Sequence, residues 1–114
     1  MREALQEFVM AKRAVEFFDI QDIGGGYRAK ITLAARGIKE VNARISYCEK
    51  AWDEEKQIYL GYFLPEDGLP RKARITNIED ASTFDKETGK RRPMMTLTVI
   101  LPQKDYLSLA AAVV

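Results

Sequence analysis

The chain has 114 residues, a formal net charge of +1 and one cysteine, with 46% hydrophobic and 31% charged residues. This length suits one domain with a single hydrophobic core, and this composition is typical of a globular protein. The absence of histidine excludes Ser-His and Cys-His nucleophile pairs and nearly every catalytic zinc site. We therefore expect a protein that is not an enzyme and that uses no metal or other cofactor.

The predicted cellular location follows from features that the sequence lacks. The single Cys48 excludes an internal disulfide, and no apolar run reaches the length of a membrane span. The charged N-terminus is unlike a signal peptide. We expect a cytoplasmic protein without membrane contact, and a near-zero net charge means that affinity for a polyanion would need a local basic patch.

Residues 1–18 predict a helix, because their apolar side chains recur at helical spacing. Gly24-Gly25-Gly26 ends this element and predicts a flexible turn into the first strand. The glycines do not predict a phosphate-binding loop, because that loop needs a preceding strand and a following Gly-Lys-Ser/Thr.

Five segments predict β-strands, because apolar and polar residues alternate along them. They cover about residues 27–36, 40–52, 56–64, 71–78 and 91–101. Short connections predict that consecutive strands pair, and the loss of alternation near Ile78 predicts a β-bulge. About residues 103–112 then predict a short apolar helix, docked on the barrel or buried at a homodimer interface.

This order predicts one α+β, mostly β domain over residues 1–114. The expected sheet is a five-stranded antiparallel meander, strongly curved or closed into a barrel similar in architecture to an oligonucleotide-binding barrel, with helices at both chain ends. That barrel usually carries a helix between its third and fourth strands, whereas residues 65–70 here predict a loop.

The segment Gln57–Leu64 is predicted as a central strand with two unlike faces. Ile58, Leu60 and Tyr62 form an ordinary core face. Tyr59 and Phe63 fall on the opposite face, where a solvent-facing strand is normally polar. The register of the predicted hairpins surrounds these two rings with basic side chains, and the only acid that it places among them is Glu40.

A basic and aromatic sheet face suits single-stranded nucleic acid. Lysine and arginine attract a phosphate backbone by releasing its counterions, and exposed aromatic rings stack on unpaired bases. The predicted stacking residues are Trp52, Tyr59 and Phe63. The predicted phosphate-binding residues are Arg28, Lys30, Arg44, Lys50, Lys72, Arg74, Arg91 and Arg92.

We therefore expect a sequence-tolerant protein that binds single-stranded DNA or RNA, in a role like that of phage- or plasmid-type single-stranded DNA-binding proteins in DNA replication. Two alternatives stay open. A non-enzymatic protein-binding or assembly module would use the exposed sheet or the apolar C-terminus. In a purely structural protein, a helix would cover Tyr59 and Phe63 and make both sheet faces core.

Overall fold

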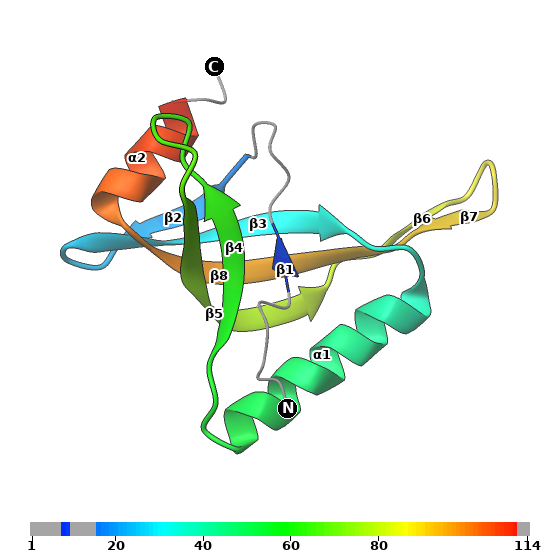
Figure 1. The fold of residues 1–114 in the computed structure, drawn as a ribbon. Coiled ribbons are helices and arrows are strands. Elements are labelled where there is room, and N and C mark those ends of the chain that lie inside the picture. The colour runs from blue at the N-terminus through cyan, green and yellow to red at the C-terminus, as the bar shows by residue number, and fades with distance from the viewer. Residues whose placement is uncertain (1–7, 10–15, 112–114) are drawn as a thin grey trace.

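A computed structural model describes residues 8–9 and 16–111 of the chain. Six strands form one sheet in the order β1-β4-β5-β8-β3-β2, and β6 and β7 form a separate hairpin (Figure 1). The elements in chain order are β1 Phe8–Val9, β2 Phe18–Asp22, β3 Gly26–Ala34, α1 Ile38–Asp53, β4 Ile58–Phe63, β5 Pro70–Asp80, β6 Thr83–Asp85, β7 Lys90–Arg92, β8 Met94–Pro102 and α2 Gln103–Ala111.

The predicted α+β class and the five-stranded antiparallel sheet are confirmed, but the connectivity is not a meander. Chain neighbours β3 and β4 are joined by α1 and lie three positions apart in the strand order. Strand β3 pairs instead with β8 and β2. The strand order ends at β1 and β2, so the described strands form an open, strongly curved sheet and no closed barrel (Figure 1).

The prediction of a strand over residues 40–52 is wrong, because this segment is the helix α1. Val41, Ile45, Cys48 and Trp52 follow one another at intervals of four, three and four residues, which is the spacing of one helix face. These four side chains pack in or against the hydrophobic core. Tyr47, predicted to point inward from a strand, is 43% exposed.

The predicted N-terminal helix is wrong at both places where the structure describes it. Phe8 and Val9 form β1, which pairs in parallel with β4, and Phe18 begins β2. The other residues of that prediction, apart from positions 16 and 17, lie outside the described part of the chain. The predicted C-terminal helix is confirmed as α2 as far as Ala111.

The triple glycine forms a tight hairpin turn between β2 and β3. Gly24 and Gly25 have φ angles of +81° and +85°, which suit a two-residue turn whose central residues are both left-handed. The Ile23 amide donates to the Gly26 carbonyl at 3.0 Å. Gly26 itself is required by packing, because a Cβ there would lie 2.8 Å from the Leu101 carbonyl oxygen.

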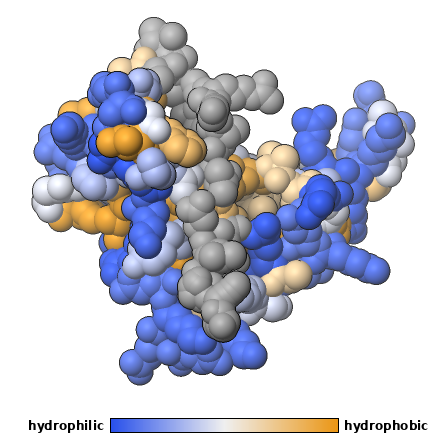
Figure 2. Space-filling model, viewed as in Figure 1, coloured by the Kyte–Doolittle hydropathy of each residue, from blue (hydrophilic) through white to orange (hydrophobic). Residues whose placement is uncertain are grey.

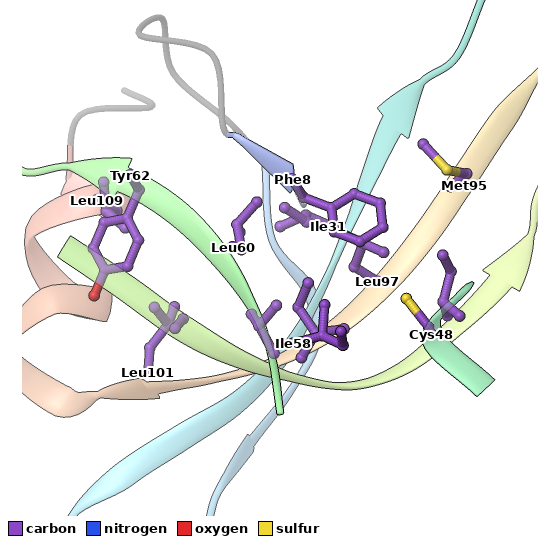
Figure 3. Close-up of a cluster of buried hydrophobic side chains, with 14 of the residues drawn as sticks. Phe8, Ile31, Cys48, Ile58, Leu60, Tyr62, Met95, Leu97, Leu101 and Leu109 are labelled. Atoms are coloured by element: carbon purple, nitrogen blue, oxygen red, sulfur yellow. The ribbon is translucent and has the colours of Figure 1, made fainter. Parts of the chain in front are cut away.

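The hydrophobic core lies on the concave face of the sheet, between the strands and the two helices. Helix α1 contributes Val41, Cys48 and Ala51, and α2 contributes Leu109. Figure 3 shows core side chains from separate elements pointing toward one another, among them Phe8, Ile31, Leu60, Leu97 and Leu101. We call the opposite, convex side of the sheet the outer face.

The predicted β-bulge occurs in β5 slightly earlier than expected. The pairing of β5 with β8 shifts register between Ile75 and Asn77, whereas the alternation pointed to Ile78. The shift keeps Ile75 and Ile78 on the buried face of the sheet, where they pair with the buried Val99 and Leu97 of β8. It also turns Glu79 to the outer face, because Glu79 pairs with the outward Thr96.

Candidate nucleic-acid interface

A row of outward side chains crosses five strands of the sheet. Tyr59 of β4 pairs with Arg74 of β5, Arg74 with Ile100 of β8, Ile100 with Arg28 of β3, and Arg28 with Gln21 of β2. Paired residues share a face of the sheet, and four strand spacings amount to roughly 19 Å. The fold thus places two arginines and one aromatic ring, far apart in sequence, on one line.

At the β4 end of this row, neighbouring side chains hold the Tyr59 ring in place. The Lys72 ammonium lies 4.5 Å from the centroid of the Tyr59 ring, in cation–π geometry. The Tyr59 hydroxyl donates to Gln57 Oε1 at 2.5 Å. Tyr59 is half-buried, so its position is held while part of the ring faces solvent.

Trp52 reaches the same region from the end of α1. A surface hollow of about 260 Å³ is lined by Trp52, Gln57, Arg74, Ile75 and Thr76. Trp52 is half-buried and packs one side against the core. Trp52 and Gln57 therefore line the same hollow, and the end of a helix, not a strand, brings Trp52 there.

Phe63 lies on the outer face two residues beyond Gly61 and is 42% exposed. The buried side chains of both described helices belong to the core on the opposite side of the sheet. Neither α1 nor α2 therefore covers Tyr59 or Phe63. The second-core arrangement, in which a helix hides both rings, is not found among the described residues.

Three predicted phosphate-binding residues are placed elsewhere or already engaged. Arg44 lies on α1, where its Nε is 3.2 Å from Glu40 Oε2 and its guanidinium lies 4.8 Å from the Phe8 ring centroid. Lys50 is exposed on α1, about 200° around the helix axis from Trp52. Lys30 is on the outer face but pairs with Asp19 at 3.4 Å.

The charge distribution also differs from the prediction. Glu40 is in the first turn of α1 and not on the sheet. A hydrogen bond from the Arg36 amide, then the neighbouring Arg44 side chain, lower the pKa of Glu40. The outer face instead carries Asp19 and Glu79, so its positive charge is concentrated at one end of the strands, on Arg28, Lys72 and Arg74.

The middle of the outer face offers little to a ligand. Thr96 and Thr98 of the central strand β8 are only 8% and 6% exposed. The hydroxyl of Thr96 lies 3.2 Å from that of Thr32 on β3. Any contact with a large molecule must therefore come from the longer side chains that flank this strand.

Arg91 and Arg92 lie apart from the sheet, on the hairpin formed by β6 and β7. This hairpin projects from the ends of β5 and β8 (Figure 1). Phe84 is its exposed aromatic residue, at 59%, and sequence reasoning missed it because no strand was predicted between about residues 78 and 91. The polar–aromatic–polar pattern of Thr83-Phe84-Asp85 beside a turn was the available signal.

Other kinds of site find little support in the part of the chain that the structure describes. Its cysteine and acidic side chains form no group of three that could hold a metal ion. Neither of its helices has the length and apolar character needed to cross a membrane. In comparisons with known proteins, no family model, curated protein or solved structure matches the chain.

Proposed function

We propose that the outer face binds single-stranded nucleic acid with little sequence preference. One observation carries this proposal: Tyr59, Lys72 and Arg74 are immediate neighbours on the sheet, and Arg74 also lines a surface hollow. Arg74 has no ion-pair partner within 4 Å among the described residues. An aromatic ring beside uncompensated cations is the elementary unit of single-strand binding.

In this proposal Tyr59 stacks on a base at the β4 end of the row, and Phe63 offers a second ring four residues farther along β4. Trp52 lines the hollow beside Arg74. The ammonium of Lys72 and an incoming base compete for the same face of the Tyr59 ring. When the base takes that face, Lys72 moves aside and pairs with a phosphate, as do Arg74 and Arg28. Stacking and phosphate contacts do not read base edges, so binding tolerates any sequence.

A closed barrel, one of the two expected forms of the sheet, is not required for this role. A barrel of the oligonucleotide-binding type presents a curved sheet face to its ligand. We propose that the open, curved sheet of this chain presents its Tyr59–Arg74–Arg28 row in the same way. A single strand would then lie across the β-strands at this row.

The test is a titration with oligothymidine, followed through the fluorescence of Trp52, with oligouridine in parallel. Stacking is worth about 1–3 kcal/mol per base, so Tyr59→Ala should weaken binding roughly 5- to 150-fold. For single strands the logarithm of the affinity falls by about 0.7 per phosphate contact for each tenfold rise in salt. Lys72→Gln should reduce that slope by one such step.

Lys50→Gln is the matched control, because it removes the same charge from the solvent side of α1. It should leave both affinity and salt slope unchanged. Equal losses for Lys50→Gln and Lys72→Gln would contradict the proposed location. Unchanged Trp52 emission and no salt-sensitive binding at micromolar protein would refute the proposed function itself.

A second candidate, self-association, is favoured by exposed apolar residues near one end of the molecule. Phe18, Ile20 and Ile23 in or beside the edge strand β2, and Leu107 on α2, are between 39% and 51% exposed. Figure 2 shows hydrophobic surface gathering on the left of the view, around these elements. Homodimerisation predicts a doubled mass in light scattering that Ile20→Ser reduces to that of the monomer.

A further inference from the structure

The projecting hairpin, which we call the arm (residues 81–93), is structurally separate from the sheet. Its three ladder pairs are Thr83 with Arg92, Phe84 with Arg91, and Asp85 with Lys90. Pro93 has no amide hydrogen, which favours a break between β7 and β8. The Met94 amide donates to Ser82 Oγ at 3.1 Å there, so a side chain takes the place of a backbone acceptor at the base of the arm.

Phe84 is the most exposed large hydrophobic residue in the described part of the chain, at 59%. A single exposed apolar side chain is ordinary on a protein surface, so exposure alone indicates nothing. Its surroundings are more informative. Phe84 and Arg91 are directly paired across the ladder and therefore lie on the same face of the ribbon.

The arm concentrates unpaired positive charge. Lys86, Lys90, Arg91 and Arg92 have no ion-pair partner within 4 Å among the described residues. The nearby carboxylate of Asp85 is committed to the turn, where it accepts the amide of Glu87 at 2.9 Å. That backbone hydrogen bond lowers the pKa of Asp85, which keeps the carboxylate in its structural role.

These side chains surround a space of the right size for one nucleotide. A hollow of about 490 Å³ is lined by Thr83, Phe84, Asp85, Thr88, Lys90, Arg91 and Arg92. Small-molecule sites typically measure about 300–1,000 Å³. A ribbon that enters a duplex groove needs a convex face, whereas a hollow around an exposed ring suits an unpaired base.

We infer that the arm is a second subsite for the single strand, where Phe84 stacks on a base while Arg91, its neighbour on the same face of the ribbon, contacts a flanking phosphate. This inference rests on the proposed function of the outer face. Thr83 lies nine positions after Arg74, which is at most about 30 Å along β5 and its extension. One strand bound at both subsites must span that gap, so affinity should depend on oligonucleotide length.

The experiment is an anisotropy titration of labelled oligothymidines between about 4 and 16 nucleotides long, the range of site sizes for such platforms. Wild-type affinity should rise once the oligonucleotide reaches the arm. Phe84→Ala should weaken binding of the longest oligonucleotide roughly 5- to 150-fold and leave binding of the shortest unchanged. Phe84→Trp should retain the wild-type affinity, because it keeps a stacking ring.

Lys90→Gln and Lys86→Gln form a matched pair on the same arm. Lys90 lines the hollow and Lys86 does not, so only Lys90→Gln should weaken binding of the longest oligonucleotide appreciably. Far-ultraviolet circular dichroism and the urea midpoint should be unchanged in both variants, since the arm contributes nothing to the buried core.

The outcomes separate the two proposals. If the wild type binds but Phe84→Ala binds every length equally well, the arm inference is overturned and the outer-face proposal stands. If a labelled hairpin duplex, titrated in parallel, is the only probe whose binding Phe84→Ala weakens, the arm inference is also overturned, because the arm then recognises paired DNA. If the wild type binds no oligonucleotide of any length, the proposed function fails, and the arm inference with it.

Discussion

The hydrogen bond between Tyr62 and Asp105 joins α2 to the edge region of the sheet, and Tyr62→Phe removes it without changing the ring. The Tyr62 hydroxyl donates to Asp105 Oδ2 at 2.5 Å, and the two residues are 2% and 5% exposed. Solvent therefore cannot readily replace the lost donor. The carboxylate of Asp105 is left buried with one partner fewer.

The magnitude follows from the two groups involved. Hydrogen bonds to charged groups contribute about 1.5–3 kcal/mol to the free energy of unfolding. Asp105 also lies in the first turn of α2, where the helix N-terminus still stabilises a negative charge. We therefore expect Tyr62→Phe to cost about 1.5–2 kcal/mol at neutral pH, at the lower end of that range.

The same bond predicts how the cost changes with pH. Burial, then the hydrogen bond to Asp105, raise the pKa of Tyr62 above its usual value of 10.0. Because the pKa of Tyr62 is higher in the folded state, the stabilisation from its hydrogen bond is complete below pH 10. Above pH 10 this stabilisation is progressively lost, because Tyr62 in the unfolded chain releases its proton first. The gap between wild type and Tyr62→Phe should close by about 1.4 kcal/mol per pH unit.

Urea unfolding followed through Trp52 fluorescence at pH 7, 10 and 11 measures both effects. Tyr59→Phe is the control at pH 7: its hydroxyl bonds to Gln57 at the surface, so the change should stay within about 0.5 kcal/mol. A stability of Tyr62→Phe equal to wild type at pH 7, or a gap that stays constant between pH 10 and 11, would show the reasoning to be wrong.

Two further predictions test the fold. Gly26→Ala should lower the unfolding free energy by about 1–3 kcal/mol in a urea titration, because its Cβ would meet the Leu101 carbonyl oxygen at 2.8 Å. Gly37→Ala is the comparison variant: no atom lies within 4 Å of its added Cβ, so it should cost only the roughly 0.5–1 kcal/mol by which glycine is a better N-cap of α1 than alanine. Glu40→Gln should cost up to about 1 kcal/mol at pH 7, since Glu40 accepts from the Arg36 amide at 2.7 Å and pairs with Arg44. Because these partners lower the pKa of Glu40 below its usual 4.5, that stabilisation is present above pH 4.5 and disappears as pH falls through the folded-state pKa. A gap between wild type and Glu40→Gln that persists at pH 2 would contradict this assignment.

The predicted placement of side chains on one sheet face agrees with the structure where neighbouring strands are joined by a short connection. The loop between β4 and β5 spans only residues 64–69, so alternation along both strands already places Tyr59, Lys72 and Arg74 on one face. The position of Arg28 on the same face as Arg74 was also predicted correctly, although β3 and β5 are not adjacent. Arg28 and Ile31 are three positions apart in β3, so they point to opposite faces of the sheet. Arg28 therefore faces outward in any register that buries Ile31.

The prediction failed where one segment fits two periodicities. In residues 40–52, polar residues recur at every second position, while Val41, Ile45, Cys48 and Trp52 recur at helical spacing. Short amphipathic segments are ambiguous in this way, and tertiary burial decides between them. The error displaced Arg44 and Lys50 from the predicted interface and hid the pairing of β3 with β8.

Local sequence determined the features that depend on nearby residues alone. Alternation of apolar and polar residues determined which side chains of β3, β4 and β8 point inward. Gly24 and Gly25 allowed a turn with positive φ angles, and the residues after Pro102 favoured a short helix. These outcomes need only backbone sterics and burial of one face. They sufficed to indicate that Tyr59 lies on an outward face.

Only the tertiary structure decided which elements meet. Helix α1 carries the chain from β3 to the far side of the sheet, so the order of strands depends on contacts between residues such as Ile31 and Leu97, 66 positions apart. No local pattern encodes such pairings, because their free energy comes from burying one shared core. That core placed Trp52 beside Arg74, paired Lys30 with Asp19, and left Phe84 exposed on a separate arm.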